Sequence, residues 1–296
     1  MRLFFAFIAL VAVAIIPLHA GATTANTIDE LAAMYSIEKC ADCHEDIHKE
    51  WASSWHGKSI VDPRVLRTFR TFIKSGLDKS PGAKRKDLKD VCLPCHVPQT
   101  KDASDELIVK ISDLIVTAVD DKDAAKREAA NKELAKLSIN CLACHNLKGA
   151  ADGNPKEKTI YGPGTASDTS PHKEELGYDS VKSDFIKTSK FCAVCHHGCP
   201  PDMPSSICPT LYTSYEEKYK AHGGNKTCQE CHMLVEGKIS HKFPGIFEAD
   251  FAKQGVALTI DARPTEYVYH LENRIVPAVV VKVDVKNTSG HGMPHG

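Results

Sequence analysis

The stretch Cys40-Ala41-Asp42-Cys43-His44 sets the pattern for the whole sequence. Two cysteines stand three positions apart, and a histidine follows the second one directly. The same C-x-x-C-H pattern occurs four more times, so that ten of the 12 cysteines in this chain of 296 residues lie in five motifs. The motif residues are Cys40, Cys43, His44, Cys92, Cys95, His96, Cys141, Cys144, His145, Cys192, Cys195, His196, Cys228, Cys231 and His232.

This spacing is the signature of covalent attachment of c-type haem. The two thiols add to the two vinyl groups of one haem, and the following histidine binds the iron as its proximal axial ligand. Zinc sites, redox-active thiol pairs and disulfides also use C-x-x-C, but none of them requires histidine directly after the second cysteine. With 15 histidines in 296 residues, five such matches by chance have a probability below about one in a million. We therefore predict five covalently attached c-type haems, and we assign no catalytic side chain.

Each haem iron has a second axial position, which electron carriers close with a further side chain and catalytic haems leave open. Nine histidines remain after the motif histidines and His19 are set aside. We predict five of them as distal ligands because they lie in expected turns or loops, where the backbone can approach a flat macrocycle closely. These five are His56, His172, His222, His241 and His291. The remaining candidates are His48 and His197 in reserve, a structural His270, and the less favoured Met233 and Met293.

Two cysteines, Cys199 and Cys208, lie outside the motifs and enclose a segment rich in Pro and Ser. In an oxidising compartment a disulfide between them is the expected state. The alternative is a reactive thiol near a haem.

The N-terminus predicts export. Arg2 precedes an apolar run over residues 3–18, and small residues follow at Ala20 and Ala22. This is the pattern of a signal peptide over residues 1–22, while a retained membrane anchor is the alternative, for which the run is short. We expect a periplasmic or extracellular protein. The 37 Lys and Arg balance the 38 Asp and Glu, which provides no basic surface for nucleic acid.

Hydrophobic periodicity predicts one helix over residues 105–119 and a second over residues 123–137. Residues 148–180 indicate an irregular wrap, and residues 256–260 and 279–285 indicate strands. The expected fold is mainly α and irregular: a multihaem cytochrome wrapped around a chain of five haems, which supply much of the core, with a few strands near the C-terminus. We expect a pentahaem domain over residues 23–255 and a short β-containing region over residues 256–296, which is either a short natural end or a truncated module.

The chain resembles the multihaem cytochrome family typified by the tetrahaem cytochrome of ammonia oxidisers. That family is related to the hydroxylamine oxidoreductase group and to extracellular filament cytochromes. The resemblance covers most of residues 38–296. The resemblance rests on the first motif followed by residues 51–56, on Ile160-Tyr161-Gly162-Pro163 upstream of His172, and on the segments 228–233, 240–245 and 290–294. It implies a compact haem chain with the same five distal ligands, and the closing β region of the family is incomplete here.

Two functions are consistent with five haem motifs. The first is electron transfer through closely spaced haems, with other cytochromes, a quinol-oxidising membrane complex or an extracellular acceptor as partners. It includes a homo-oligomer or a conducting filament in which one subunit supplies a distal histidine to the next. The second is a reductase or oxidase of a small nitrogen or sulfur compound at one five-coordinate haem. Because all five motifs end in histidine, and such enzymes often replace one proximal histidine by lysine, the sequence favours electron transfer.

Overall fold

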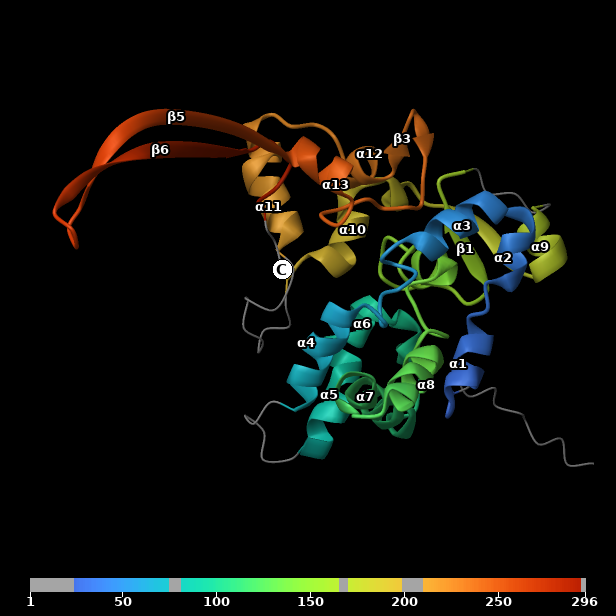
Figure 1. Cartoon of the computed structure of the whole chain (residues 1–296). Coiled ribbons are helices and arrows are strands. Elements are labelled where there is room, and N and C mark those ends of the chain that lie inside the picture. The colour runs from blue at the N-terminus through green and yellow to red at the C-terminus, as the bar shows by residue number, and fades with distance from the viewer. Residues whose placement is uncertain (1–23, 75–80, 165–169, 199–209, 294–296) are drawn as a thin grey trace, which may run out of the picture.

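The computed structural model describes residues 24–74, 81–164, 170–198 and 210–293 (Figure 1). Residues 1–22 and the cysteines Cys199 and Cys208 lie outside the described residues, so the signal peptide and the disulfide stay predictions. The helices and helical turns are α1 (Ile28–Met34), α2 (Glu38–Cys43), α3 (Glu45–Ser53), α4 (Pro63–Ile73), α5 (Pro81–Val91), α6 (Leu93–His96), η1 (Pro98–Asp102), α7 (Asp105–Asp120), α8 (Ala124–Leu134), η2 (Ala143–Leu147), α9 (Pro171–Leu176), η3 (Asp184–Lys187), α10 (Ser189–His196), α11 (Leu211–Lys218), η4 (Lys220–His222), α12 (Cys228–His232), α13 (Ala249–Ala252) and η5 (Lys253–Gly255). The strands are β1 (Thr159–Gly162), β2 (Asp179–Lys182), β3 (Leu234–Val235), β4 (Lys238–Ile239), β5 (Val256–Tyr269) and β6 (Arg274–Asn287).

The mainly helical fold confirms the expected fold class, and both predicted long helices are present. The first, α7, begins at the Ser104 cap, whose hydroxyl accepts a hydrogen bond from the Leu107 N–H at 3.2 Å. Asp123 caps the second, α8, in the same way through the Ala125 N–H. A side-chain oxygen at this position satisfies an N–H group that the helix itself leaves unpaired.

The helices α4, α5, α7 and α8 form one lobe, which we call the helical lobe (Figure 1). It has a conventional apolar core, in which Leu66 and Phe69 of α4 meet Ile108, Ile111 and Ile115 of α7. This part of the chain differs from the expectation that haems supply the core. The reason is that α4 and α7 each carry an apolar stripe at helical spacing, and burial of each such side chain contributes roughly 1.5–3 kcal/mol.

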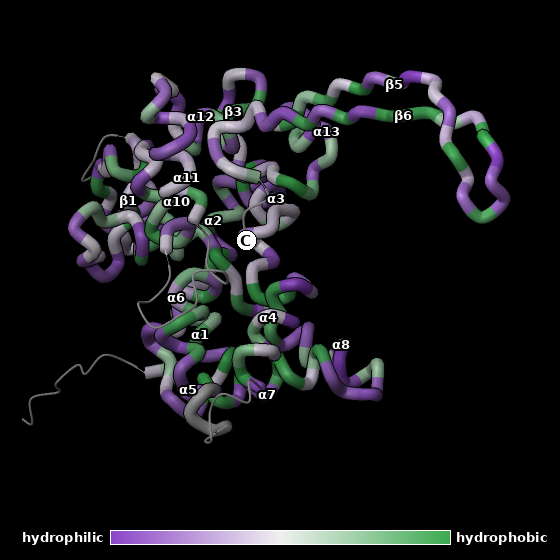
Figure 2. Tube along the Cα trace, turned by 90° about the vertical axis from the view of Figure 1, so that its left-hand side faces the viewer, coloured by the Kyte–Doolittle hydropathy of each residue, from purple (hydrophilic) through white to green (hydrophobic). Residues whose placement is uncertain are grey.

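The second half of the described chain is organised differently. Every residue of the apolar core cluster lies between Ala25 and Leu147. Among the later described residues, the only buried large apolar side chains are Tyr161 and Tyr215. Short helices carry the last two of the five motifs here, and Figure 2 shows mixed hydropathy around α10 and α12. This half therefore depends on something other than apolar side chains for its stability.

The described part of the chain also contains three separate two-stranded sheets. Strands β1 and β2 pair in parallel, with Thr159 opposite Asp179, and α9 lies between them in sequence. The expectation of an irregular wrap over residues 148–180 is therefore wrong where β1, α9 and β2 form, while residues 148–158 are turns and irregular chain as expected. The short hairpin β3–β4 follows α12, and the long antiparallel hairpin β5–β6 projects from the body (Figure 1). Both predicted strands lie inside this long hairpin and are shorter than the strands observed.

No helix in the described part of the chain has the length and apolar character needed to span a bilayer.

The cap of α4 generates a testable prediction. Asp62 accepts a hydrogen bond from the Arg64 backbone N–H at 2.7 Å and one from the Arg64 Nε at 2.9 Å. The bond from the Arg64 side chain holds the pKa of the Asp62 carboxyl below its ordinary value of 3.8. Because the folded pKa is depressed, the stabilisation is present above the unfolded value and is lost as the pH falls through the folded value. We expect Asp62→Ala to lower the free energy of unfolding by about 1 kcal/mol at neutral pH, and by less in strong acid.

Thermal unfolding of the haem-loaded protein, followed by circular dichroism at neutral and acidic pH, measures this difference. Ser104→Ala is the matched control, because it removes the cap of α7 with a hydroxyl that does not titrate in this range. An Asp62→Ala effect that is equal at both pH values contradicts the prediction.

Candidate haem centres

Each C-x-x-C-H motif lies on a short helix or helical turn. Cys40 and Cys43 are on α2. Cys92 is the N-cap of α6, which holds the rest of the second motif, and the third motif lies in the π-helical turn η2 and just before it. The fourth motif ends α10, and the fifth forms the whole of α12, which Thr227 caps. A helical turn places both cysteines and the histidine on one side of the backbone, since residues three and four apart are neighbours on a helix surface. None of the ten motif cysteines forms a disulfide.

Four motif histidines each face a predicted distal histidine. The ring centroids of His44 and His172 lie 6.1 Å apart, and those of His56 and His196 are also 6.1 Å apart. The other two pairs are His145 with His241 at 6.4 Å and His232 with His291 at 6.2 Å. Each pair joins one histidine of a motif to one histidine outside the motifs. His56, His241 and His291 lie in turns or loops as expected, whereas His172 lies on the short helix α9.

This spacing fits one metal ion between the two rings. An imidazole nitrogen binds a metal at about 2.0–2.1 Å. In a five-membered ring with bonds of about 1.33 Å, each atom lies about 1.1 Å from the centroid. Two imidazoles on opposite sides of one ion therefore have centroids about 6.2 Å apart, which matches all four observed distances. Direct stacking of two rings would allow a closer approach, down to about 4.5 Å.

The His172 ring is held by its own short helix and the neighbouring strand. Ser170 caps α9, and Gly177, at φ 69°, ends the helix in the left-handed conformation that glycine adopts without strain. The His172 Nδ1 lies 3.2 Å from the Ser180 hydroxyl on β2. The parallel pairing of β1 with β2 therefore fixes the position of this ring.

The His241 ring depends on a contact from the far end of the sequence. The His241 backbone N–H donates to Glu50 Oε2 on α3 at 2.8 Å. Its Nδ1 is buried and has no hydrogen-bond partner. An unpaired buried ring nitrogen is costly in a chain alone, and a metal-bound group beside His145 and His241 fits such a site.

The other two paired distal candidates, His291 and His56, lie in tight turns. His291 follows β6, and the N–H of the next residue, Gly292, donates to the Ser214 hydroxyl of α11 at 2.6 Å. His56 precedes Gly57, where a Cβ atom would lie 2.6 Å from the Trp51 carbonyl oxygen, so only glycine fits. The Trp51 indole in turn donates to the Ile139 carbonyl at 2.7 Å.

Hydrogen bonds and burial prepare the motif histidines as neutral ligands. The Nδ1 atoms of His145 and His232 lie 2.8 Å from the carbonyl oxygens of Tyr161 and Pro244. A carbonyl only accepts, so Nδ1 carries the proton and Nε2 is left free to bind a metal. Burial lowers the pKa of several histidines, and for His56 burial and the nearby His196 lower it to about 3. The other histidines whose pKa burial lowers are His96, His145, His196, His232 and His241.

The second motif is the exception. The Nδ1 of His96 lies 3.2 Å from the Ser59 carbonyl oxygen, in the same arrangement as the other motif histidines. Its nearest ring is Phe69, at 4.9 Å and almost perpendicular. A group across an iron from His96 would lie beyond about 6 Å, so Phe69 packs beside the imidazole. The described residues place no histidine opposite His96 at the spacing of the other four pairs.

The fifth predicted distal ligand, His222, ends the helical turn η4 and is exposed. The structure does not bring it together with a motif histidine. The reserve candidates have other neighbours: the His48 ring lies near Trp51, and the His197 ring lies near Tyr212. His270 lies beside Tyr267 near the tip of the long hairpin.

Thiols of different motifs touch one another. Cys141 donates a hydrogen bond to Cys40, which lowers the pKa of the Cys40 thiol and raises that of Cys141. Two further thiol pairs behave in the same way: Cys195 with Cys95, and Cys192 with Cys228. Cys144 also lies close enough to raise the pKa of both Cys192 and Cys195. The fourth motif therefore has the second, third and fifth as neighbours, and the first adjoins the third.

Several of these positioning groups carry no signal in the sequence. Glu50 stands 191 positions before His241, and Ser214 stands 78 positions before Gly292. No local pattern singles out either residue. In contrast, the glycine after His56 directly follows the stretch over residues 51–56 that carries the family resemblance.

Comparison with known proteins agrees with this picture. Residues 39–115, which contain the first two motifs, match the family model described as cytochrome c554 and c-prime. The fold is similar to that of a penta-haem cytochrome c552 from Thermochromatium tepidum, with a TM-score of 0.54 and 20% sequence identity over 90% of this chain and 68% of that one. No curated protein sequence matches the chain.

The fold and the motifs define a class, the c-type cytochromes with covalently bound haem. Within this class, the family model matches residues 39–115, and the solved structure shows a similar multihaem cytochrome fold. The family description agrees with the resemblance noted in the sequence at this level.

Removal of one distal candidate tests the pairing. In the haem-loaded protein we expect His241→Ala to convert one haem from low spin to high spin, because His145 then lacks a ligand opposite it. The haem content stays the same, because Cys141 and Cys144 still attach the macrocycle. Low-temperature electron paramagnetic resonance of the oxidised protein measures the change.

The matched control is His270→Ala, which removes a histidine that faces no motif. If the His241→Ala spectrum equals that of the wild type, the pairing of His145 with His241 is wrong.

Proposed function

We propose that this chain is an exported pentahaem c-type cytochrome, which transfers electrons between redox partners through a chain of mostly bis-His haems. The observation that carries the proposal is the set of four histidine pairs at 6.1–6.4 Å. Closed axial positions favour electron transfer over catalysis, because no substrate can then reach the iron. The N-terminal pattern over residues 1–22 supports export.

A bound haem supplies a reversible one-electron couple at its iron. The residues of this chain would attach each haem, orient the histidine ligands and set the reduction potential of the iron. Paired thiols hold each macrocycle, carbonyl groups such as that of Tyr161 fix the ring orientation of the motif histidines, and burial keeps those rings neutral.

The contacts between thiols support an order for the haems. The first haem would adjoin the third, the third would adjoin the fourth, and the fourth would adjoin both the second and the fifth. An electron could then cross the molecule between the first and fifth haems by way of the third and fourth, while the second haem is a branch. Suitable partners are other cytochromes, a quinol-oxidising membrane complex or an extracellular acceptor.

The environment of His96 favours a second candidate function at that branch. With no histidine opposite His96 in the described residues, the second haem would have an open axial position. An open iron can bind a small molecule, so a reductase or oxidase of a small nitrogen or sulfur compound is the alternative. In this case the other four haems would deliver or remove the electrons.

Three measurements on the haem-loaded protein separate these functions. Chemical haem determination against protein concentration is expected to give five haems per chain. Electron paramagnetic resonance is expected to show four low-spin haems and one high-spin haem, and the reduced protein is expected to bind carbon monoxide at one haem. Only one haem is expected to bind carbon monoxide because an exogenous ligand binds an iron only where no protein ligand occupies the axial position.

Each outcome bears on a named claim. Fewer than five haems contradicts the pentahaem proposal, and more than one high-spin haem contradicts the four closed pairs. Five low-spin haems and no binding of carbon monoxide leave the carrier function standing and exclude the open second haem. His222→Ala then identifies whether His222 closes that iron.

A further inference from the structure

A cluster of aromatic and basic side chains lies beside His56. Trp55 directly precedes His56, and the Trp55 and Phe247 rings meet edge to face with their centroids 5.3 Å apart. The Arg64 guanidinium carbon lies 4.7 Å from the Trp55 centroid and 3.4 Å from the Phe247 centroid. We call this cluster the aromatic patch, and its members are Trp55, Lys58, Arg64, Ile246 and Phe247.

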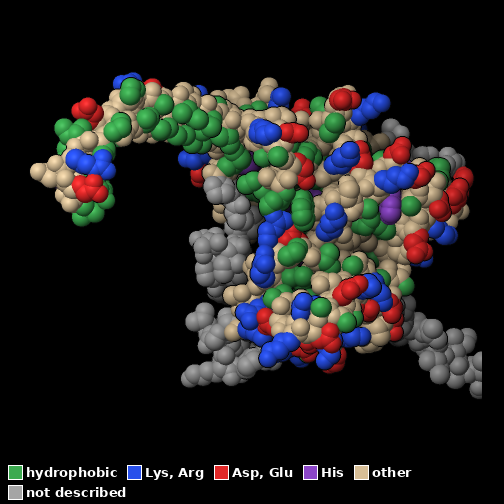
Figure 3. All heavy atoms as spheres, in the orientation of Figure 1, with side chains coloured by type: hydrophobic (Ala, Val, Ile, Leu, Met, Phe, Trp, Pro, Cys, Tyr) green, Lys and Arg blue, Asp and Glu red, His purple; other side chains and the backbone are tan. Residues whose placement is uncertain are grey.

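The apolar members of the aromatic patch are open to solvent. The exposed fractions of Trp55, Ile246 and Phe247 are 39%, 59% and 57%. In Figure 3, Lys and Arg side chains gather beside hydrophobic ones between the helical lobe and the elements above it. Exposed aromatic and Arg side chains are the types that dominate the binding energy of protein interfaces. The composition of the patch is therefore that of a docking site.

The basic members of the patch are already held in place. The Arg64 Nε donates to Asp62 at 2.9 Å, and the Lys58 Nζ donates to the Ser53 carbonyl at 2.9 Å. The Lys58 Nζ also lies 5.8 Å from the Trp55 centroid. Side chains that are fixed before a partner arrives lose less conformational entropy on binding.

The charge that the patch offers to a partner is positive. The charged residues of segments 54–64 and 242–248 are Lys58, Arg64, Lys242, Asp62 and Glu248. Both carboxylates are engaged within the chain, because the buried Asp62 binds Arg64 and Glu248 accepts the Gly245 N–H at 2.7 Å. In the part of the chain that the structure describes, neither Lys58 nor Lys242 has a carboxylate partner. This charge selects a partner whose surface carries carboxylates.

The patch also adjoins the histidine pair assigned to the fourth haem. The His56 ring faces His196 of the fourth motif, and Phe243 packs edge-on against His56 at 4.5 Å. Only three residues separate Phe243 from Phe247 in the patch. A protein bound to the patch would therefore stand next to the fourth haem, which adjoins three of the other four haems in the proposed order.

We propose that the aromatic patch is the docking site of an acidic one-electron carrier protein, which exchanges electrons with the fourth haem. This inference rests on the proposed electron-transfer function. In the exchange, one electron passes from the reduced carrier to one ferric haem iron, which becomes ferrous, and no bond forms or breaks. Electron-transfer encounters bury less than about 1,200 Å², so a patch of a few side chains is sufficient.

The test uses the haem-loaded protein and a reduced plant-type ferredoxin, which is an acidic one-electron carrier. Stopped-flow absorption measures the second-order rate constant of haem reduction. We expect this rate constant to fall as the NaCl concentration rises, because salt screens the attraction between opposite charges. At an ionic strength of about 0.1 M, Lys58→Glu is expected to lower it about 10-fold, and Phe247→Ala about 5-fold.

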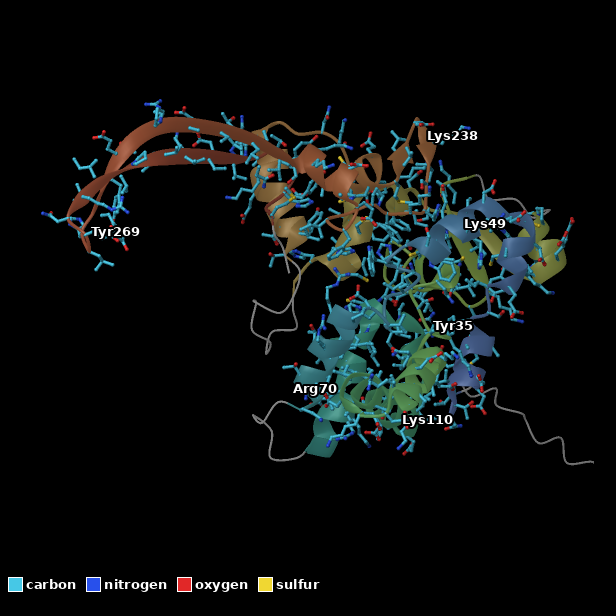
Figure 4. All side chains as sticks on the ribbon, viewed as in Figure 1. Tyr35, Lys49, Arg70, Lys110, Lys238 and Tyr269 are labelled. Carbon is cyan, nitrogen blue, oxygen red and sulfur yellow. The ribbon has the colours of Figure 1, made fainter. Side chains whose placement is uncertain are left out.

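Matched controls make the same changes outside the patch. Lys110→Glu reverses a charge on α7, and Leu271→Ala truncates an 86% exposed side chain in the turn of the long hairpin β5–β6, which we call the arm. Figure 4 shows Lys110 on the helical lobe and Tyr269 near the tip of the arm. Both controls are expected to leave the rate constant nearly unchanged, since charges beyond a Debye length are screened.

A second readout requires no electron transfer. Carbodiimide treatment of the two oxidised proteins joins lysines to carboxylates that are in contact, and we expect cross-links at Lys58 or Lys242. Cross-links at other lysines only, a rate constant that does not fall with salt, or equal effects of Lys58→Glu and Lys110→Glu overturn the docking site.

Reduction by dithionite separates failure of the docking site from failure of the proposed function. This small reductant needs no docking site, so every variant is expected to be reduced at the wild-type rate. Haems that dithionite reduces and ferredoxin reaches without the patch overturn the docking site alone. Haems that dithionite does not reduce overturn the electron-transfer function and the docking site with it.

Discussion

Pairs of histidine rings about 6 Å apart tie together segments that are distant in sequence. His44 meets His172, His56 meets His196, and His145 meets His241. Two bare imidazoles at this distance attract each other weakly, so the pairs cannot hold the chain by themselves. A metal-bound macrocycle between them would convert each pair into a cross-link. Such cross-links would stabilise the second half of the chain, which has few buried apolar side chains of its own.

The helical lobe has a different source of stability. Its core brings α4, α5, α7 and α8 together through side chains such as Leu66, Phe69 and Ile111. The same Phe69 also packs against the His96 ring. The apolar core of the helical lobe therefore contacts the second motif directly through Phe69. This contact holds the His96 ring in position without a second histidine opposite it. This difference explains why an open position would be tolerated at the second haem rather than at the other four.

The sequence predicts which residues attach the haems better than it predicts which histidines face each other. A C-x-x-C-H motif is local, so spacing alone selects ten cysteines and five histidines as the expected haem-attachment residues. The distal candidates His56, His172, His241 and His291 could be selected from their turns, but nothing local says that His172 faces the first motif or that His241 faces the third. Those pairings follow from long-range contacts such as that of Glu50 with the His241 backbone. His222 shows the same limit, because its glycine-rich context suits a ligand and yet the structure leaves it exposed.

The arm and the fifth motif are mechanically connected. The side chains of Asn287, at the end of β6, and of Ser289 both donate to the His291 carbonyl, at 2.8 and 2.6 Å. The Thr288 N–H also bonds to the Gly255 carbonyl at the base of β5. A shift of the arm is thus transmitted to the residue whose ring faces His232. A contact that moves the arm would therefore also move His291, at one end of the proposed electron path.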